Sequence, residues 1–237
     1  MPEQFGVDLD AVLNRKYPMI DELDPRKTAL IVVDMQRYFL DPDQPAYLPG
    51  GNGAPSSETV LENVVKAVEL CRHHGIQVIW SRWGLRGDGW DVGRWAPKWP
   101  TWHAGTPEGP SWENPAIDIA PPLSPGPNEP VFDKSRYSSF WGTPLDSFLR
   151  HIPTVDTLVM VGVTTNFCVR YTVEDAFSRD YAVVVLADCT TATNDPIQAE
   201  VSGSGQYVAA LRDIAIGLGD VWTLAEFTAE LDGSRAR

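Results

Sequence analysis

Four short runs of apolar, mostly β-branched residues limit the folds open to this chain more than any other feature of its sequence. They are TALIVVD at 28–34, IQVIWS at 76–81, DTLVMV at 156–161 and YAVVVLA at 181–187. Each run is apolar almost throughout rather than at alternate positions, which is typical of parallel strands covered on both faces. Shorter runs at 130–132 and 221–223 are candidates for two further strands.

Segments with the helical spacing of apolar residues separate these runs. They cover 57–74, 143–151, 168–180 and about 196–211. Ser56 or Ser57 can cap the first of these helices, Gly75 can end it, and Thr143 can cap the second. The alternation of strands and helices predicts an α/β fold, a doubly wound parallel sheet with helices on both faces.

One region, at about 83–130, does not follow this alternation. It is rich in Pro and Gly and holds six tryptophans, namely Trp83, Trp90, Trp95, Trp99, Trp102 and Trp112. A long loop inside a compact domain is commonly a lid or a binding loop, and its aromatic content opposes disorder. We therefore expect a structured lid or an oligomer contact, within one domain that spans 1–237 and has an N-terminal extension at 1–27. The tail at 226–237 is expected to be frayed.

The overall charge narrows the classes of partner. The 32 acidic side chains against 19 basic ones give a formal net charge of −13, which argues against nucleic acid or an anionic membrane. The three cysteines are widely spaced and match no disulfide framework, and no stretch approaches the ~18 apolar residues of a membrane span. These features predict a cytoplasmic protein whose partner is a small molecule.

Three chemically reactive residues follow three of the predicted strands. Asp34 ends the first run, Lys134 comes two residues after 130–132, and Cys168 opens the helical pattern that follows 156–161. The carboxyl ends of parallel strands lie at one edge of a sheet, so these side chains are expected to meet there. A helix N-terminus and a nearby cation lower the pKa of a thiol, which would make Cys168 a nucleophile with Asp34 as its acid–base partner. Taken alone, a cysteine in this position is more often a buried structural residue.

Other chemistries lack their sequence patterns. The chain has no GxGxxG or Walker A stretch to hold the phosphates of a nucleotide, and no GxSxG turn for a serine nucleophile. Its four histidines show no metal-ligand spacing. We therefore expect neither a cofactor nor a metal ion.

Three segments carry a resemblance to a known family. They are ALIVVDMQ at 29–36, KSRYSSFWGTPLDSFLR at 134–150 and VGVTTNFCVRYTVEDAFSRDY at 161–181. In these segments the chain resembles the isochorismatase-like cysteine hydrolases and is most similar to the branch of N-carbamoylsarcosine and ureidoacrylate amidohydrolases. The insert at 83–130 matches no motif of the family.

The resemblance implies a six-stranded, Rossmann-like parallel sheet and a catalytic triad of Asp34, Lys134 and Cys168. It also implies a cis peptide bond between Val163 and Thr164. The backbone amides of Thr164 and Cys168 would then form the oxyanion hole.

The resemblance further implies the reaction class. It predicts a metal-independent cysteine amidohydrolase that cleaves a C–N bond of a small linear amide, ureido or N-carbamoyl compound through a thioester on Cys168. Ammonia would be released, together with carbon dioxide when a carbamoyl group is cleaved. The stretch WSRWGLRGDGW at 80–90 lacks the Asp–His–His motif of nicotinamidases. Two alternatives stay open: a vinyl ether hydrolase of the isochorismatase type, and a catalytically silent member that acts as a binding protein.

Several side chains near the predicted site are candidates for substrate binding. The arginines that could hold a substrate carboxylate are Arg82, Arg86, Arg94 and Arg170. The residues that could wall the pocket are Phe39, Trp83, Tyr137, Phe140, Trp141 and Asn166. Family members are commonly dimers or tetramers whose neighbours contribute to the pocket, so a homodimer or homotetramer is expected.

Overall fold

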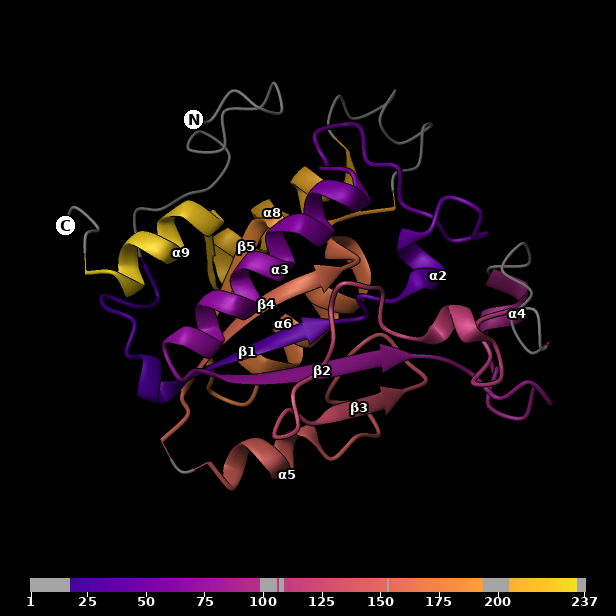
Figure 1. The fold of residues 1–237 in the computed structure, drawn as a ribbon, viewed down its shortest axis with the longest axis horizontal. Coiled ribbons are helices and arrows are strands. Elements are labelled where there is room, and N and C mark those ends of the chain that lie inside the picture. Colours follow the sequence, from indigo (N-terminus) through magenta and orange to yellow (C-terminus); the bar gives the residue numbers. More distant parts are fainter. Residues whose placement is uncertain (1–17, 99–105, 107–108, 153, 194–204, 234–237) are drawn as a thin grey trace.

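The computed structural model describes residues 18–98, 106, 109–152, 154–193 and 205–233, and its centre is one parallel sheet (Figure 1). The strands are β1 Thr28–Val33, β2 Gln77–Trp83, β3 Val131–Lys134, β4 Thr157–Val163, β5 Ala182–Thr191 and β6 Asp220–Trp222. Their order is β3-β2-β1-β4-β5-β6, and every neighbouring pair is parallel. The six-stranded α/β fold predicted from the sequence is confirmed.

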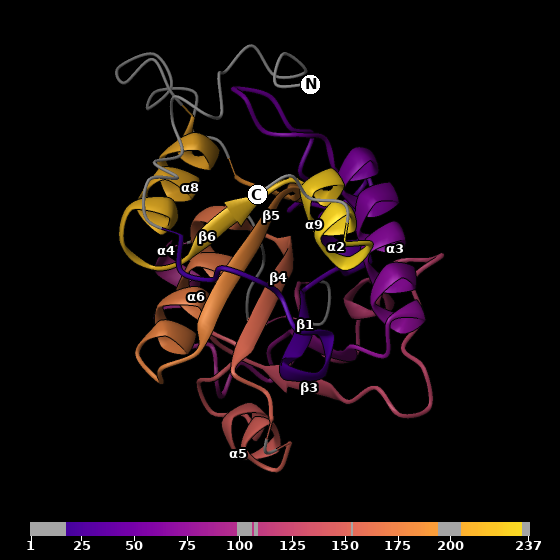
Figure 2. The ribbon, with the colours of Figure 1, turned by 90° about the vertical axis from the view of Figure 1, so that its left-hand side faces the viewer.

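Helices cover both faces of the sheet, as Figure 2 shows. On one face lie α3 Ser57–His73 and α9 Leu224–Leu231, and on the other lie α6 Arg170–Phe177 and α8 Gln206–Gly217. The residues of β1 alternate between the two cores. Leu30 and Val32 pack in the first, whereas Ala29, Ile31 and Val33 pack in the second. Burial on both faces explains why this strand is apolar at every position.

Two predicted helices begin close to where the sequence placed them. The Ser56 side chain accepts a hydrogen bond from the Thr59 amide and caps α3, as expected. The short helix α5 Leu145–Arg150 begins later than predicted, because Pro144 occupies its N-cap. Thr143 Oγ1 still accepts a hydrogen bond from the Leu145 amide at 3.2 Å, so its side chain helps to start the helix from one position earlier.

Near the C-terminus the sequence predictions were less accurate. The helix predicted at 196–211 appears as α8 and extends to Gly217, while 194–204 lies outside the described residues. The prediction of a frayed tail at 226–237 was wrong for its first part, because 226–231 belong to α9. Thr223 and Glu226 form a reciprocal capping box at the start of this helix, a signal that could have been found in the sequence.

The insert at 83–130 is tied to the sheet at several points in its described part. Its first residue, Trp83, belongs to β2, which ends two residues later than predicted. The insert contains α4 Trp95–Lys98 and a 3-10 turn, η4 Pro115–Ile117. The amides of Trp112 and Leu85 donate to carbonyls across the loop, at 3.0 and 2.7 Å. Two of the tryptophans named above, Trp99 and Trp102, lie outside the described residues.

None of the described helices combines the length and the apolar character that crossing a membrane requires. All three cysteines are free and buried.

Candidate active site

The carboxyl ends of β1, β3 and β4 bring Asp34, Lys134 and Cys168 together. Asp34 follows β1 directly and Lys134 is the last residue of β3. Lys134 Nζ donates to Asp34 Oδ2 at 2.6 Å, and neither side chain has any solvent exposure. The Cys168 thiol is buried beside them, near enough that both side chains shift its pKa. These are the three residues that the strand-end argument had placed at one edge.

The backbone at the end of β1 turns sharply to present the Asp34 carboxylate. Asp34 has a φ of 51°, in the left-handed region that Asp tolerates better than most residues. Its amide donates to the Ser81 carbonyl at 3.0 Å, and its carbonyl accepts from the Gln36 amide at 2.8 Å. The turn is therefore held from both sides, which is how a strained conformation persists at a functional site.

Burial controls the protonation of the site. Desolvation raises the pKa of Asp34, and the Lys134 ammonium opposes this effect. Desolvation alone would lower the pKa of Lys134, but the Asp34 carboxylate and Cys168 outweigh it and raise that pKa. Each group therefore favours the charged form of the other across their buried contact at 2.6 Å.

The same burial determines the state of the thiol. Desolvation raises the pKa of Cys168 more strongly than Lys134 lowers it, and the Asp34 carboxylate raises it further. The sequence had predicted a lowered pKa, and the net direction is the opposite. Cys168 is therefore a neutral thiol, and a thiol in this state would need a base to act as a nucleophile.

The turn that holds Cys168 connects β4 to α6. The peptide bond between Val163 and Thr164 is cis, and Thr165–Val169 form a π-helical turn. The Thr164 carbonyl accepts from the amides of Phe167 and Val169, both at 3.1 Å. The Thr165 hydroxyl bonds to the Thr190 hydroxyl at 2.7 Å, which anchors the turn to β5.

A chain of buried hydroxyl groups reaches the triad and was not found from the sequence. Ser81 Oγ donates to Asp34 Oδ1 at 3.3 Å, and Ser139 Oγ donates to Ser81 Oγ at 2.9 Å. Thr172 Oγ1 accepts from the Ser139 amide at 3.0 Å and donates to the Cys168 carbonyl at 2.7 Å. The available signal was the polar Ser81 at the end of an otherwise apolar run.

Gln36 is a second buried polar residue whose role the sequence did not show. Its Nε2 donates to the carbonyls of Trp83 and Ile117, at 2.9 and 2.6 Å, and its Oε1 accepts from the Trp83 amide at 2.8 Å. The side chain therefore joins the end of β1 to the end of β2 and to the insert. This contact holds the insert beside the triad.

Three of the arginines predicted to bind a carboxylate are already paired with acidic side chains, and none of the three lines a cavity described below. The pairs are Arg82 with Asp133 and Asp118, Arg86 with Asp88, and Arg170 with Glu174 and Asp213. The contact of Arg82 with Asp133 is bidentate, at 2.8 and 3.0 Å. The fourth arginine, Arg94, lines the larger cavity.

The other predicted pocket residues are divided between core and cavity. Trp141 lines the smaller of the two cavities described below, and Tyr137 lines the larger. Phe39, Trp83 and Phe140 are buried in the two cores. Asn166 Nδ2 donates to Thr193 and to Gln206, so its amide links the nucleophile turn to the end of β5 and to α8.

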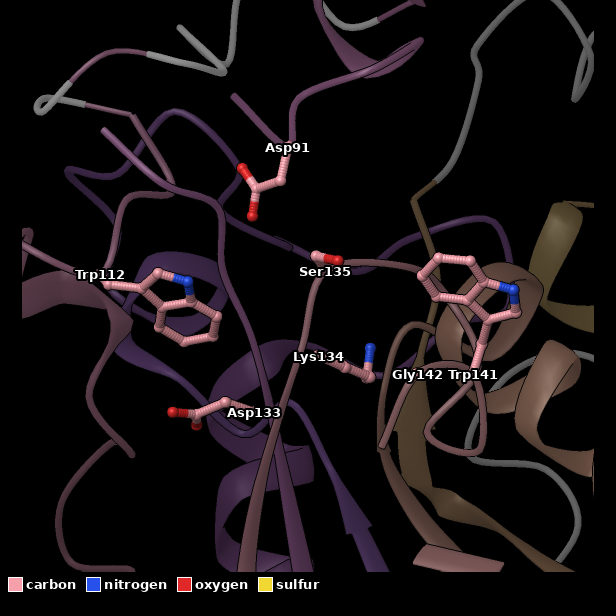
Figure 3. A pocket seen from close by; sticks show the side chains of 7 residues that line it. All are labelled: Asp91, Trp112, Asp133, Lys134, Ser135, Trp141 and Gly142. Atoms are coloured by element: carbon pink, nitrogen blue, oxygen red, sulfur yellow. The ribbon is translucent and has the colours of Figure 1, made fainter. Parts of the chain in front are cut away.

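Two cavities lie near the triad. The smaller, of about 300 Å³, is lined by Asp91, Trp112, Asp133, Lys134, Ser135, Trp141 and Gly142 (Figure 3). The larger, of about 560 Å³, is lined by Gly93, Arg94, Trp95, Lys98, Arg136, Tyr137, Phe167 and Tyr171. Neither Asp34 nor Cys168 is among the residues that line these two cavities. Phe167, which precedes Cys168 in the chain, places the larger cavity next to the nucleophile turn.

Within the described residues, no group of three or more His, Cys, Asp or Glu side chains is arranged to hold a metal ion.

The structure defines a parallel α/β fold with Asp34, Lys134 and Cys168 together at one edge of the sheet, and known proteins resemble the chain in sequence and fold. A family model described as the isochorismatase domain matches residues 28–215, so the chain belongs to the isochorismatase family.

Individual relatives cover most of the chain. It is 34% identical to a ureidoacrylate amidohydrolase RutB of Methylorubrum extorquens over 233 residues, with 90% of this chain and 86% of the relative covered. The same enzyme of Cronobacter sakazakii is 35% identical over 188 residues, with 73% and 78% covered.

Among solved structures, a cysteine hydrolase of Pseudomonas syringae pv. phaseolicola is 29% identical. It superimposes with a TM-score of 0.77 over 93% of this chain and all of that chain. The N-carbamoylsarcosine amidase of Thermoplasma acidophilum is 24% identical and has a TM-score of 0.64, with 84% and 98% covered, which shows a shared fold.

Proposed function

We propose that this chain is a cysteine amidohydrolase that cleaves a C–N bond of small linear ureido or N-carbamoyl compounds. The observation that carries the proposal is the buried contact of Lys134 with Asp34, together with a buried Cys168 thiol near enough for both to shift its pKa. A neutral thiol next to a carboxylate can lose its proton as it attacks, so no free thiolate has to be stored. The ureidoacrylate amidohydrolases among the relatives support the reaction class.

In the first half-reaction Cys168 Sγ bonds to the substrate carbonyl carbon while Asp34 takes the thiol proton. The backbone amides of Thr164 and Cys168 hold the oxyanion, and the Lys134 ammonium stabilises the developing negative charge. Asp34 then gives the proton to the leaving nitrogen. The C–N bond breaks, ammonia departs, and a thioester remains on Cys168.

In the second half-reaction Asp34 takes a proton from water, and the water oxygen attacks the thioester carbonyl. The C–S bond breaks and the proton returns to Cys168. When the substrate is a ureido compound, the product is a carbamate that decays to an amine and carbon dioxide. The roles given to these three side chains require no metal ion.

The test is ammonia release from 3-ureidoacrylate and a panel of N-carbamoyl acids. The wild type should release ammonia, and Cys168→Ala and Asp34→Asn should each lower kcat/KM by about 10³-fold or more, because each removes a group of the reacting centre. Asp156→Asn is the matched control, since Asp156 also adjoins a buried strand but is 60% exposed, at the end of β4 opposite to the Cys168 turn. Circular dichroism checks that each variant is folded.

Two results would contradict the proposal. Hydrolysis that survives Cys168→Ala would rule out the thioester and favour ether cleavage of the isochorismatase type. Binding of these compounds without ammonia release by the wild type would favour a catalytically silent binding protein.

A further inference from the structure

The larger cavity collects three cationic side chains beside the nucleophile turn. Arg94 and Lys98 come from the insert, and Arg136 comes from the loop after β3. None of the eight lining residues is Asp or Glu. Within the described part of the chain, these three cations form no ion pair with a carboxylate, whereas Arg82, Arg86 and Arg170 do.

This arrangement reverses the charge of the molecule locally. The chain carries 32 acidic and 19 basic side chains, so an average surface region is acidic. A concave site lined by one sign of charge concentrates ligands of the opposite sign. The cavity therefore favours an anion even though the protein as a whole repels one.

Arg136 is held in a fixed orientation. Its Nη1 donates to the carbonyls of Asp91 and Ser135, at 3.1 and 2.6 Å, and its guanidinium lies 5.3 Å from the centre of the Trp141 ring. The Arg136 side chain also packs closely on Gly93, where a Cβ would lie 3.2 Å from Nη2. A guanidinium fixed in this way keeps its other donors aligned for a planar acceptor.

Aromatic rings form the remaining wall. The Tyr137 ring lies nearly parallel to those of Phe167 and Tyr171, with centroids 5.0 and 5.1 Å away and interplanar angles of 16° and 14°. Trp95 packs against Tyr137 at 4.7 Å. Flat aromatic walls suit a small planar ligand, and Phe167 adjoins Cys168 in the chain.

We propose that this cavity binds the carboxylate of a ureido or N-carbamoyl acid, and that Arg94 and Lys98 make the enzyme select acids over neutral amides. The carboxylate lies at the cationic end, with Arg136 as a fixed third cation, and the planar ureido group extends along the aromatic wall towards Cys168. Guanidinium groups bind carboxylates through two parallel hydrogen bonds, which matches this ligand class. The part of this inference that places the ureido group of the ligand towards Cys168 rests on the proposed function.

The experiment compares two probes that differ only in charge, 3-ureidopropanoate and 3-ureidopropanamide. For the wild type, kcat/KM should favour the acid. In Arg94→Gln and Lys98→Met, kcat/KM for the acid should fall by about 10- to 100-fold, mainly through a higher KM, because a remote carboxylate is held equally in ground and transition states. The values for the neutral amide should stay within about twofold of the wild type.

Arg150→Gln is the control for a change of net charge. Arg150 lies on α5, is 60% exposed, pairs with Asp146 and lines neither cavity. Its removal should leave both probes unaffected. Equal losses for acid and amide in Arg94→Gln and Lys98→Met, or the same loss of acid selectivity in Arg150→Gln, would overturn the inference.

A binding measurement separates this inference from the proposed function. Isothermal titration calorimetry of the Cys168→Ala variant with each probe needs no turnover. Binding of the acid but not of the amide, lost when Arg94→Gln is added, supports the cavity even if the wild type hydrolyses neither probe. Equal binding of the two probes would overturn it even if hydrolysis occurs.

Discussion

Asp34 has a different neighbour on each carboxylate oxygen, and this division suits an acid–base residue. Oδ2 faces the Lys134 ammonium at 2.6 Å and Oδ1 faces the Ser81 hydroxyl at 3.3 Å. Burial raises the pKa of Asp34, while both neighbours favour its anion. The residue can therefore take a proton from the thiol and return it within one turnover.

Ser81→Ala should move the acid limb of the pH–rate profile to higher pH. The change removes a hydrogen bond to the Asp34 anion, so the pKa of Asp34 rises further. Activity is lost as pH falls through that pKa, and the loss should therefore begin about 0.5–1 pH unit earlier. The measurement is kcat/KM against pH with a ureido acid.

The control for this change is Ser147→Ala, because the Ser147 hydroxyl of α5 donates to the carbonyl of Pro144 at the start of that helix. Ser81→Thr keeps a hydroxyl and should restore most of the profile. A uniform decrease at all pH values without a shifted limb would mean that Ser81 acts only through the fold.

At the scale of secondary-structure elements, a close contact between β1 and β4 positions the strand ends next to Asp34 and Cys168. Gly162 in β4 has a φ of 107°, and a Cβ there would lie 2.0 Å from the Val33 carbonyl oxygen of β1. Val33 immediately precedes Asp34, and Gly162 lies just before the turn that holds Cys168. The absence of a side chain at this position therefore allows the two strand ends to approach.

Gly162→Ala should destabilise the protein by about 3 kcal/mol or more. Left-handed backbone costs a non-glycine residue about 1–2 kcal/mol, and overpacking adds about 1–3 kcal/mol. Urea denaturation followed by circular dichroism measures the loss. Gly217→Ala at the end of α8 is the control, because a Cβ there meets nothing within 4 Å. Equal midpoints for the two variants would contradict the role of Gly162.

At the scale of the whole molecule, the position of each cysteine relative to the sheet determines how accessible its thiol is. Cys71 of α3 and Cys189 of β5 are 0% exposed in the same core, whereas Cys168 is 7% exposed at the sheet edge. Burial raises the thiol pKa of all three residues. Their reactivity therefore differs by access more than by ionisation.

Iodoacetamide should alkylate Cys168 first, about tenfold or more faster than the other two cysteines, because the core thiols require local unfolding before they react. The rate at Cys168 should be low at pH 7 and rise with pH, since the reagent needs the thiolate. Peptide mass spectrometry of time points measures each site. Equal rates at all three cysteines would show that Cys168 is as enclosed as the core thiols.

The sequence by itself determined the buried strands and the order of the elements, and it placed Asp34, Lys134 and Cys168 at strand ends. Apolar runs covered on both faces can form only interior parallel strands, and their reactive residues then share one edge. The tertiary structure alone decided what depends on contacts between distant segments. These are the hydroxyl chain from Thr172 to Asp34, the cationic cavity, and the neutral state of Cys168. The net pKa of the thiol follows from how much water the assembled fold excludes, and no local pattern contains that quantity.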